Sequence, residues 1–235
     1  MSKKYSIVEV FYSQQGEGVR AGTMNVFVRF AGCNMECDDK PGPRSPGGFK
    51  CDTYFASGRA VTLEELAQWC GREVTAANPS LGFEAGLKAC PGWPEPWLVL
   101  TGGEPGLQVD WEFCDFWHAR GVKLAIETNG SVELPKARDL ETGLPAYHAY
   151  LDWITVSPKV AEHAIEQRFA DEVKYVIADG MAIPKTRVRA LNYLVSPRFD
   201  GNLMAQRHLD WCLKLTRENP QWRISVQNHK AWVVR

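Results

Sequence analysis

Short runs of β-branched and aromatic residues alternate along this chain with longer segments of mixed polar and apolar residues. The short runs are typical of strands, whereas the longer segments repeat their apolar residues at helical spacing. This alternation favours a parallel sheet with crossover helices, which is an α/β fold. The expected strands span residues 6–11, 24–30, 97–101, 122–127, 151–156, 172–177, 190–195 and 223–227.

Helices are expected in three of the longer segments. Thr62 is a suitable N-cap because Glu65 stands three residues later, in the capping-box position. Asp110 can cap a second helix that ends near Gly121. A third helix is expected over about residues 201–217. Helices are therefore fewer than strands, which favours an incomplete barrel over a closed eightfold one.

The composition excludes several classes of protein. A chain of 235 residues suits one large domain with a substantial core. Its net charge of −1, without long runs of like charge, argues against a nucleic-acid surface. Its longest apolar stretches are too short to span a bilayer, and its polar start predicts no signal peptide. We therefore expect a cytoplasmic protein with neither a nucleic-acid nor a membrane partner.

Seven cysteines are unevenly placed, and their odd number argues against a disulfide framework. Cys33, Cys37 and Cys51 follow the expected strand at 24–30. The thirteen residues between Cys37 and Cys51 hold three prolines and three glycines, so we interpret them as a loop. The other four are expected to be small core residues: Cys70, Cys90, Cys114 and Cys212.

If that loop closes on itself, the three thiolates converge. Thiolates are soft ligands that suit iron–sulfur clusters or zinc. Three ligands would leave one iron of a four-iron cluster open to a substrate or cosubstrate. The spacing alone leaves two other interpretations open, namely a structural zinc site and three unrelated buried cysteines.

Polar and glycine-rich segments follow several of the expected strands. In a parallel sheet the carboxyl ends of the strands meet at one edge, so these segments are expected to share a pocket. Gly102 and Gly103 would let a ligand approach the backbone, and Glu104 could accept a hydrogen bond from an amine. The segments are residues 101–105, 128–130, 157–159 and 196–197.

The cysteine pattern and the strand ends together resemble the radical S-adenosylmethionine superfamily. Cys33 and Cys37 are separated by three residues, as in its signature, but thirteen residues rather than the usual two precede Cys51. The resemblance implies a [4Fe-4S] cluster on these three cysteines. It also implies S-adenosyl-L-methionine binding by these residues: Gly103, Glu104, Ser157, Pro158, Lys159, Ser196, Pro197 and Arg198.

The two ends of the chain narrow the resemblance to one family. The segments 11–18, 27–33 and 224–230 resemble 7-carboxy-7-deazaguanine synthase. This family converts 6-carboxy-5,6,7,8-tetrahydropterin to 7-carboxy-7-deazaguanine with loss of ammonia, in queuosine biosynthesis. The implied fold is an incomplete, elaborated (β/α) barrel, and the implied partners are a flavodoxin- or ferredoxin-type reductant and a second copy in a homodimer. A single core domain over 1–235, with insertions near 38–50 and 71–95, is expected.

The resemblance also implies roles in substrate binding. Arg29 is expected to bind the substrate carboxylate and Thr53 a Mg²⁺ ion, which prefers oxygen ligands. Glu17 is expected to meet Arg29 or the substrate, and the final carboxylate, on Arg235, stands where it could reach the substrate. The remaining residues expected at the pterin are Gln14, Gln15, Gly16 and Thr101.

Simpler interpretations and rival functions stay open at this point. Residues 14–18 could be a plain hairpin turn, and Arg29 a strand charge paired on the sheet surface. The first rival function is a radical activase with a protein substrate, which shares the cluster motif. The second is a non-enzymatic module stabilised by zinc or a cluster.

Overall fold

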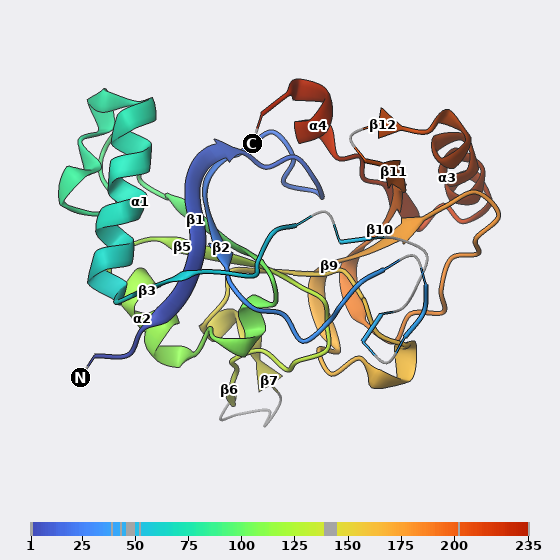
Figure 1. Ribbon diagram of the computed structural model, residues 1–235, viewed down its shortest axis with the longest axis horizontal. Coiled ribbons are helices and arrows are strands. Elements are labelled where there is room, and N and C mark those ends of the chain that lie inside the picture. Colours follow the sequence, from blue (N-terminus) through green and yellow to red (C-terminus); the bar gives the residue numbers. More distant parts are fainter. Residues whose placement is uncertain are drawn as a thin grey trace.

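A computed structural model describes residues 2–38, 40–42, 44–45, 50–51, 53–138, 145–201 and 203–234. Its main feature is a nine-stranded sheet with the order β13-β10-β9-β8-β5-β4-β2-β1-β3 (Figure 1). Neighbours from β13 to β2 run parallel, whereas β1 is antiparallel to both β2 and β3. The strands are β1 (Tyr5–Gln14), β2 (Met24–Phe30), β3 (Arg59–Val61), β4 (Trp97–Gly102), β5 (Lys123–Thr128), β8 (Trp153–Val156), β9 (Phe169–Ile177), β10 (Arg189–Pro197) and β13 (Trp222–Ile224).

All eight expected strands are present, which confirms the α/β fold. Among the described residues the edge strands β13 and β3 do not pair, so the sheet is not closed by hydrogen bonds, in keeping with an incomplete barrel. The short β3 was not expected from the sequence. Two small hairpins lie outside the main sheet: β6 (Ala137–Arg138) with β7 (Pro145–Ala146), and β11 (Phe199–Asp200) with β12 (Leu203–Met204).

The three expected helices are α1 (Leu63–Ala77), α2 (Trp111–His118) and α3 (Gln206–Glu218). Thr62 and Glu65 form the complete capping box at α1, and the Asp110 side chain accepts from the Phe113 N–H at 2.9 Å at α2. The third helix begins later than expected because the preceding residues pair in the β11–β12 hairpin. A short α4 (Asn228–Trp232) was not expected.

Short 3₁₀ turns complete the described elements. They are η1 (Pro79–Leu81), η2 (Phe83–Ala85), η3 (Pro105–Leu107), η4 (Tyr147–Ala149) and η5 (Glu162–Ala164). No helix in the described part of the chain combines the length and the apolar character that crossing a membrane requires.

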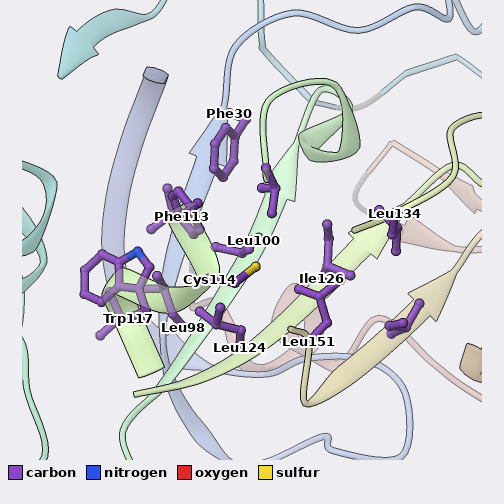
Figure 2. Close-up of a cluster of buried hydrophobic side chains, with 14 of the residues drawn as sticks. Phe30, Leu98, Leu100, Phe113, Cys114, Trp117, Leu124, Ile126, Leu134 and Leu151 are labelled. Atoms are coloured by element: carbon purple, nitrogen blue, oxygen red, sulfur yellow. The ribbon is translucent and has the colours of Figure 1, made fainter. Parts of the chain in front are cut away.

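The helices α1, α2 and α3 pack along one face of the sheet, with α1 on β1 and α3 on β10 and β13 (Figure 1). Figure 2 shows the centre of this face, where Phe113, Cys114 and Trp117 of α2 lie over Leu98 and Leu124 of the sheet. The other buried thiols, of Cys70 and Cys212, also belong to this core, as expected, whereas Cys90 is only partly buried at its edge.

The alternate residues of the same strands point to the opposite face, because successive strand side chains change sides. This second face begins with a small apolar cluster: Phe11, Phe27, Val99 and Ala125. Further along the strands it becomes polar, with Arg29, Thr101, Glu127 and Thr155 on β2, β4, β5 and β8. One face therefore stabilises the fold, and the other is available for chemistry.

The connection between β1 and β2, residues 15–23, crosses this second face. The Val19 N–H donates to Glu172 Oε2 of β9 at 2.8 Å, and the Gly18 N–H donates to Ser225 Oγ at 2.8 Å. At its start, the Gly16 carbonyl accepts from the Asn228 N–H at 2.9 Å. The loop thus spans the side where no further strands close the sheet.

We predict that Leu124→Ala lowers the free energy of unfolding by about 2–5 kcal/mol, since it empties a fully buried site under α2. Leu191→Ala removes a side chain that is 71% exposed and should change stability by less than about 0.5 kcal/mol. Urea unfolding of the two variants at equal iron content measures the difference in their free energies of unfolding. Equal losses for the two would contradict the assignment of the core to this face.

Candidate active site

Two adjoining cavities lie at the carboxyl ends of the parallel strands and on the polar face. The larger, of about 730 Å³, is lined by the three clustered cysteines and by the ends of β4, β5, β8 and β10. The smaller, of about 250 Å³, is lined by residues of the 15–23 loop, β2 and α4. Residues common to both walls are Glu17, Thr53, Thr101, Glu127, Gln227 and Lys230.

The cysteine loop closes on itself, as the sequence predicted. The Cys51 N–H donates to the Cys37 carbonyl at 3.2 Å, so the chain returns to its starting point after the excursion. Within the loop, the Glu36 N–H donates to the Arg44 carbonyl at 2.7 Å, and these two side chains form an ion pair. Cys33, Cys37 and Cys51 all line the larger cavity.

The chemistry of the three thiols fits the cluster that the sequence implies. Thiolates are soft ligands that suit iron–sulfur clusters and zinc alike. Cys33, Cys37 and Cys51 line one cavity, so three protein ligands face a space large enough for a four-iron cluster.

The environment of the thiols disfavours their ionisation when no metal is bound. Burial raises the pKa of both Cys33 and Cys37, although Lys159 acts in the opposite direction on Cys37. Asn129 Nδ2 lies 3.9 Å from Cys33 Sγ, where it can donate to the sulfur. A metal must displace the thiol protons, so binding a cluster would release them.

The glycine turn after β4 is fastened to the cysteine loop by its backbone. The Gly103 N–H donates to the Phe30 carbonyl at 3.0 Å, and the Glu104 N–H donates to the Gly32 carbonyl at 2.9 Å. A Cβ atom on Gly103 would lie 1.9 Å from the Gly32 carbonyl oxygen, so only glycine fits. This contact positions Cys33, the next residue, against the turn.

Glu104 lies beneath the cavity and is not part of its lining. Its side chain is 0% exposed and accepts from the Asn129 N–H at 2.7 Å, the Thr128 hydroxyl at 2.8 Å and the Gly106 N–H at 2.9 Å. Burial raises the pKa of Glu104, and these donors oppose the rise. In this arrangement the carboxylate holds two strand ends together and does not face the cavity.

Most of the other expected cosubstrate residues line the larger cavity. Ser157 and Lys159 do so after β8, while Pro158 between them does not. The Ser157 and Lys159 amides donate to the Thr128 and Asn129 carbonyls at 2.8 and 3.1 Å, which joins the ends of β5 and β8. The last three expected residues also belong to this lining: Ser196, Pro197 and Arg198.

The smaller cavity holds the residues that were expected to meet the substrate. Gln14, Gln15, Gly16 and Arg29 line it, beside the stacked rings of Phe11 and Phe27. The Arg29 Nε donates to Glu9 Oε1 at 2.7 Å, across the β1–β2 ladder. Of the two alternatives expected for Glu17, the pairing with Arg29 is therefore wrong, because Glu9 of the neighbouring strand binds Arg29. Its contact with the substrate stays a prediction.

Glu127 was not expected in this cavity as an individual residue. Its Oε1 accepts from Gln15 Nε2 at 3.0 Å, and its Oε2 accepts from the Thr101 hydroxyl at 2.9 Å. The signal in the sequence was its place in strand 122–127, where alternation puts it on the same face as Thr101 of the neighbouring strand. Thr53 stands on the wall between the cavities.

Glu17 is paired with Lys174 of β9, another residue that the sequence did not single out. Its other carboxylate oxygen accepts from Gln227 Nε2 at 2.7 Å. Burial lowers the pKa of Lys174 to about 8. Arg235, the last of the expected substrate residues, lies outside the described residues.

Comparison with known proteins agrees with this arrangement. No protein-family model matches the chain. The 7-carboxy-7-deazaguanine synthase of Bradyrhizobium diazoefficiens is 35% identical over 245 residues, covering 98% of this chain and 99% of the relative. The enzyme of the same name from Nitratidesulfovibrio vulgaris is 35% identical over 238 residues, covering 96% and 97%.

A solved structure shares the fold. It is the crystal structure of QueE from Escherichia coli, which superposes with a TM-score of 0.57 at 21% identity. The match covers 96% of this chain and 95% of that one.

We predict that Gly103→Ala destabilises the joint between the glycine turn and the cysteine loop and lowers iron incorporation. Overpacking of this kind typically costs about 1–3 kcal/mol. Gly42→Ala is the matched control, since its Cβ would have no neighbour within 4 Å and it lies in the cysteine loop itself. Iron and sulfide per chain after anaerobic reconstitution test the difference. Equal iron in both variants would show that the joint does not position Cys33.

Proposed function

Because this chain belongs to the 7-carboxy-7-deazaguanine synthase family, we propose that its two cavities divide the reaction between cosubstrate and substrate. The protein is a radical S-adenosylmethionine lyase of queuosine biosynthesis. It converts 6-carboxy-5,6,7,8-tetrahydropterin to 7-carboxy-7-deazaguanine with loss of ammonia. The observation that carries the division is the three-cysteine loop on one cavity and the Arg29 cavity beside it.

The larger cavity would hold the [4Fe-4S] cluster on Cys33, Cys37 and Cys51, with S-adenosyl-L-methionine beside it. Held by these three cysteines, a reduced cluster would supply one electron for the reductive cleavage of the cosubstrate. The backbone of Gly103 faces this space and can meet the cosubstrate's amino acid part. The side chains that can meet its remaining polar groups are Ser157, Lys159, Ser196 and Arg198.

Glu104 takes a different role in this proposal from the one that its motif suggested. Its carboxylate is occupied by three donors from the protein and is buried. It would act by fixing Asn129, whose amide is near Cys33, and by holding the glycine turn in place. Pro158 and Pro197 would shape the backbone and cannot donate a backbone hydrogen bond, since proline has no N–H.

The smaller cavity would hold the pterin. Gln14 and Gln15 carry amide donors and acceptors for the polar edge of the ring, and Gly16 leaves space at the wall. Arg29 retains N–H groups beyond the one given to Glu9, so its fork can bind the substrate carboxylate. Thr101 and Glu17, on the wall between the cavities, would meet the reacting part of the ring.

Thr53 is the proposed Mg²⁺ ligand on that same wall. Mg²⁺ usually takes few protein oxygens and completes its shell with water and substrate oxygens. Arg235 is proposed as a further substrate residue on the family resemblance alone.

The domain organisation, oligomeric state, compartment and reductant of the protein are also proposed from its family membership. We expect one core domain over 1–235 with insertions near 38–50 and 71–95. We expect a homodimer in the cytoplasm that is reduced by a flavodoxin or ferredoxin. The cysteines of the described chain are free thiols, which agrees with a reducing compartment.

We predict that Cys33→Ala, Cys37→Ala and Cys51→Ala each lose the four-iron cluster, because each removes one of its three protein ligands. Cys90→Ala should keep it, since Cys90 lies apart from the larger cavity. Iron content and the visible absorption of reconstituted protein are the measurements. A full cluster in Cys37→Ala, with loss in the other two, would remove Cys37 from the ligand set.

We predict that Arg29→Ala lowers kcat/KM for the pterin by about 10- to 150-fold, the range for losing a hydrogen bond to a charged group. Cosubstrate cleavage to 5′-deoxyadenosine should persist, because Arg29 does not line the larger cavity. Arg29→Lys keeps the positive charge but loses the planar guanidinium, so its kcat/KM for the pterin should lie between those of the parent and Arg29→Ala. Unchanged pterin affinity in Arg29→Ala would leave Arg29 as a strand charge paired with Glu9.

A further inference from the structure

Two inward-facing residues of β9 hold the loop that carries the substrate residues. Glu172 and Lys174 are two positions apart, so both side chains point to the polar face. Glu172 accepts from the Val19 backbone, and Lys174 pairs with the Glu17 side chain. The 15–23 loop is thus fixed to β9 at both a backbone and a side-chain position.

The Glu172 contact is a structural anchor. Its side chain is 4% exposed, and its other oxygen accepts from the Thr155 hydroxyl at 2.8 Å. Gly18 has a φ of +72°, and a Cβ there would lie 2.3 Å from Glu172 Oε1. The loop backbone therefore lies directly against this carboxylate and has little freedom to move.

The Lys174 contact differs because it ends in the cavity. The side chains of Lys174 and Glu17 are 12% and 14% exposed, and both line the larger cavity. Glu17 also lines the smaller one, so it stands where the two cavities meet. The carboxylate is largely buried, and the structure pairs it with the Lys174 ammonium.

The other neighbours of Glu17 form contacts of their own. Gln227 donates one neutral hydrogen bond to Glu17 Oε1 and carries no charge. Arg29 is engaged with Glu9, and Lys230, which also lines both cavities, donates to the Gly201 carbonyl at 3.2 Å. Loss of Lys174 would therefore remove the ion pair that the structure shows at Glu17, and with it one of the two anchors of the loop.

We propose that Lys174 is a positioning residue for substrate specificity, which holds the Glu17 carboxylate in place at the junction of the cavities so that it can accept N–H groups of the pterin. This rests on the proposed placing of the pterin in the smaller cavity. A carboxylate oxygen accepts from an N–H donor, and the ring N–H beside the reacting carbon of a tetrahydropterin is such a donor. Lys174 acts through Glu17 and contacts the substrate only by way of it.

The test compares Lys174→Met, Glu17→Gln and the double variant in reconstituted enzyme. Lys174→Met should raise the KM for 6-carboxytetrahydropterin at least about tenfold, the change expected from losing one charged contact, and should change the KM for S-adenosylmethionine less than about twofold. Because Lys174 acts through Glu17, the double variant should be no worse than Glu17→Gln alone. Lys174→Arg should recover most of the affinity.

The matched control is Lys123→Met. Lys123 also forms an ion pair in a strand of the same sheet, with Asp152 at 2.8 Å, but it lies at the amino end of β5, away from both cavities. Lys123→Met should leave the KM values for the pterin and for S-adenosylmethionine unchanged. The proposal would be overturned if the effects of the two single substitutions on the pterin KM multiplied in the double variant. Equal changes in the KM values for pterin and S-adenosylmethionine in Lys174→Met would also overturn it.

A second readout does not depend on turnover. Hydrogen exchange of residues 15–23 should be faster in Lys174→Met than in the parent or in Lys123→Met, because one of the two anchors of the loop is lost. Unchanged exchange would refute the anchoring itself. Faster exchange with an unchanged pterin KM would refute the link to specificity, whereas absence of pterin turnover in the parent would refute the proposed function instead.

Discussion

The close contact between the turn after β4 and the loop after β2 is the constraint on which the rest of the site depends. Gly103 and Glu104 give their amides to the carbonyls of Phe30 and Gly32, and the missing side chain of Gly103 lets the two backbones meet. Cys33 follows directly. Beneath the contact, Glu104 joins the same turn to the end of β5. One short segment thereby sets the position of the first cysteine and the floor of the larger cavity.

The sheet supplies two faces with different tasks. Its helix-covered face buries aromatic and aliphatic side chains, and this packing supplies most of the stability (Figure 2). The opposite face starts apolar and becomes polar toward the carboxyl ends of the strands. In the described part of the chain, the loop 15–23 and α4 cover the side of the sheet that no further strand closes, and both line the smaller cavity. Because segments 11–18 and 224–230 both contribute residues to the smaller cavity, their sequences carried the family resemblance.

Much of this arrangement could be predicted from local patterns. Strand periodicity, the Thr62 and Asp110 caps and the loop character of the region after Cys37 depend on neighbouring residues alone. The parts that were missed depend on contacts distant in sequence. The Glu17–Lys174 pair joins residues 157 positions apart, and only the sheet order brings β9 to the β1–β2 loop. Likewise, the Gly-Gly-Glu motif suggested a carboxylate open to a ligand, whereas the Glu104 side chain is buried and accepts from Thr128 and Asn129 at the end of β5.

The most direct test of the account is product analysis by the reconstituted protein. The chain is loaded anaerobically with iron and sulfide and incubated with S-adenosylmethionine, dithionite, Mg²⁺ and 6-carboxytetrahydropterin, and the products are read by mass spectrometry. The account predicts 7-carboxy-7-deazaguanine together with released ammonia. Formation of 5′-deoxyadenosine without any deazapurine would contradict it, since the cluster would then be active while the proposed substrate was not turned over.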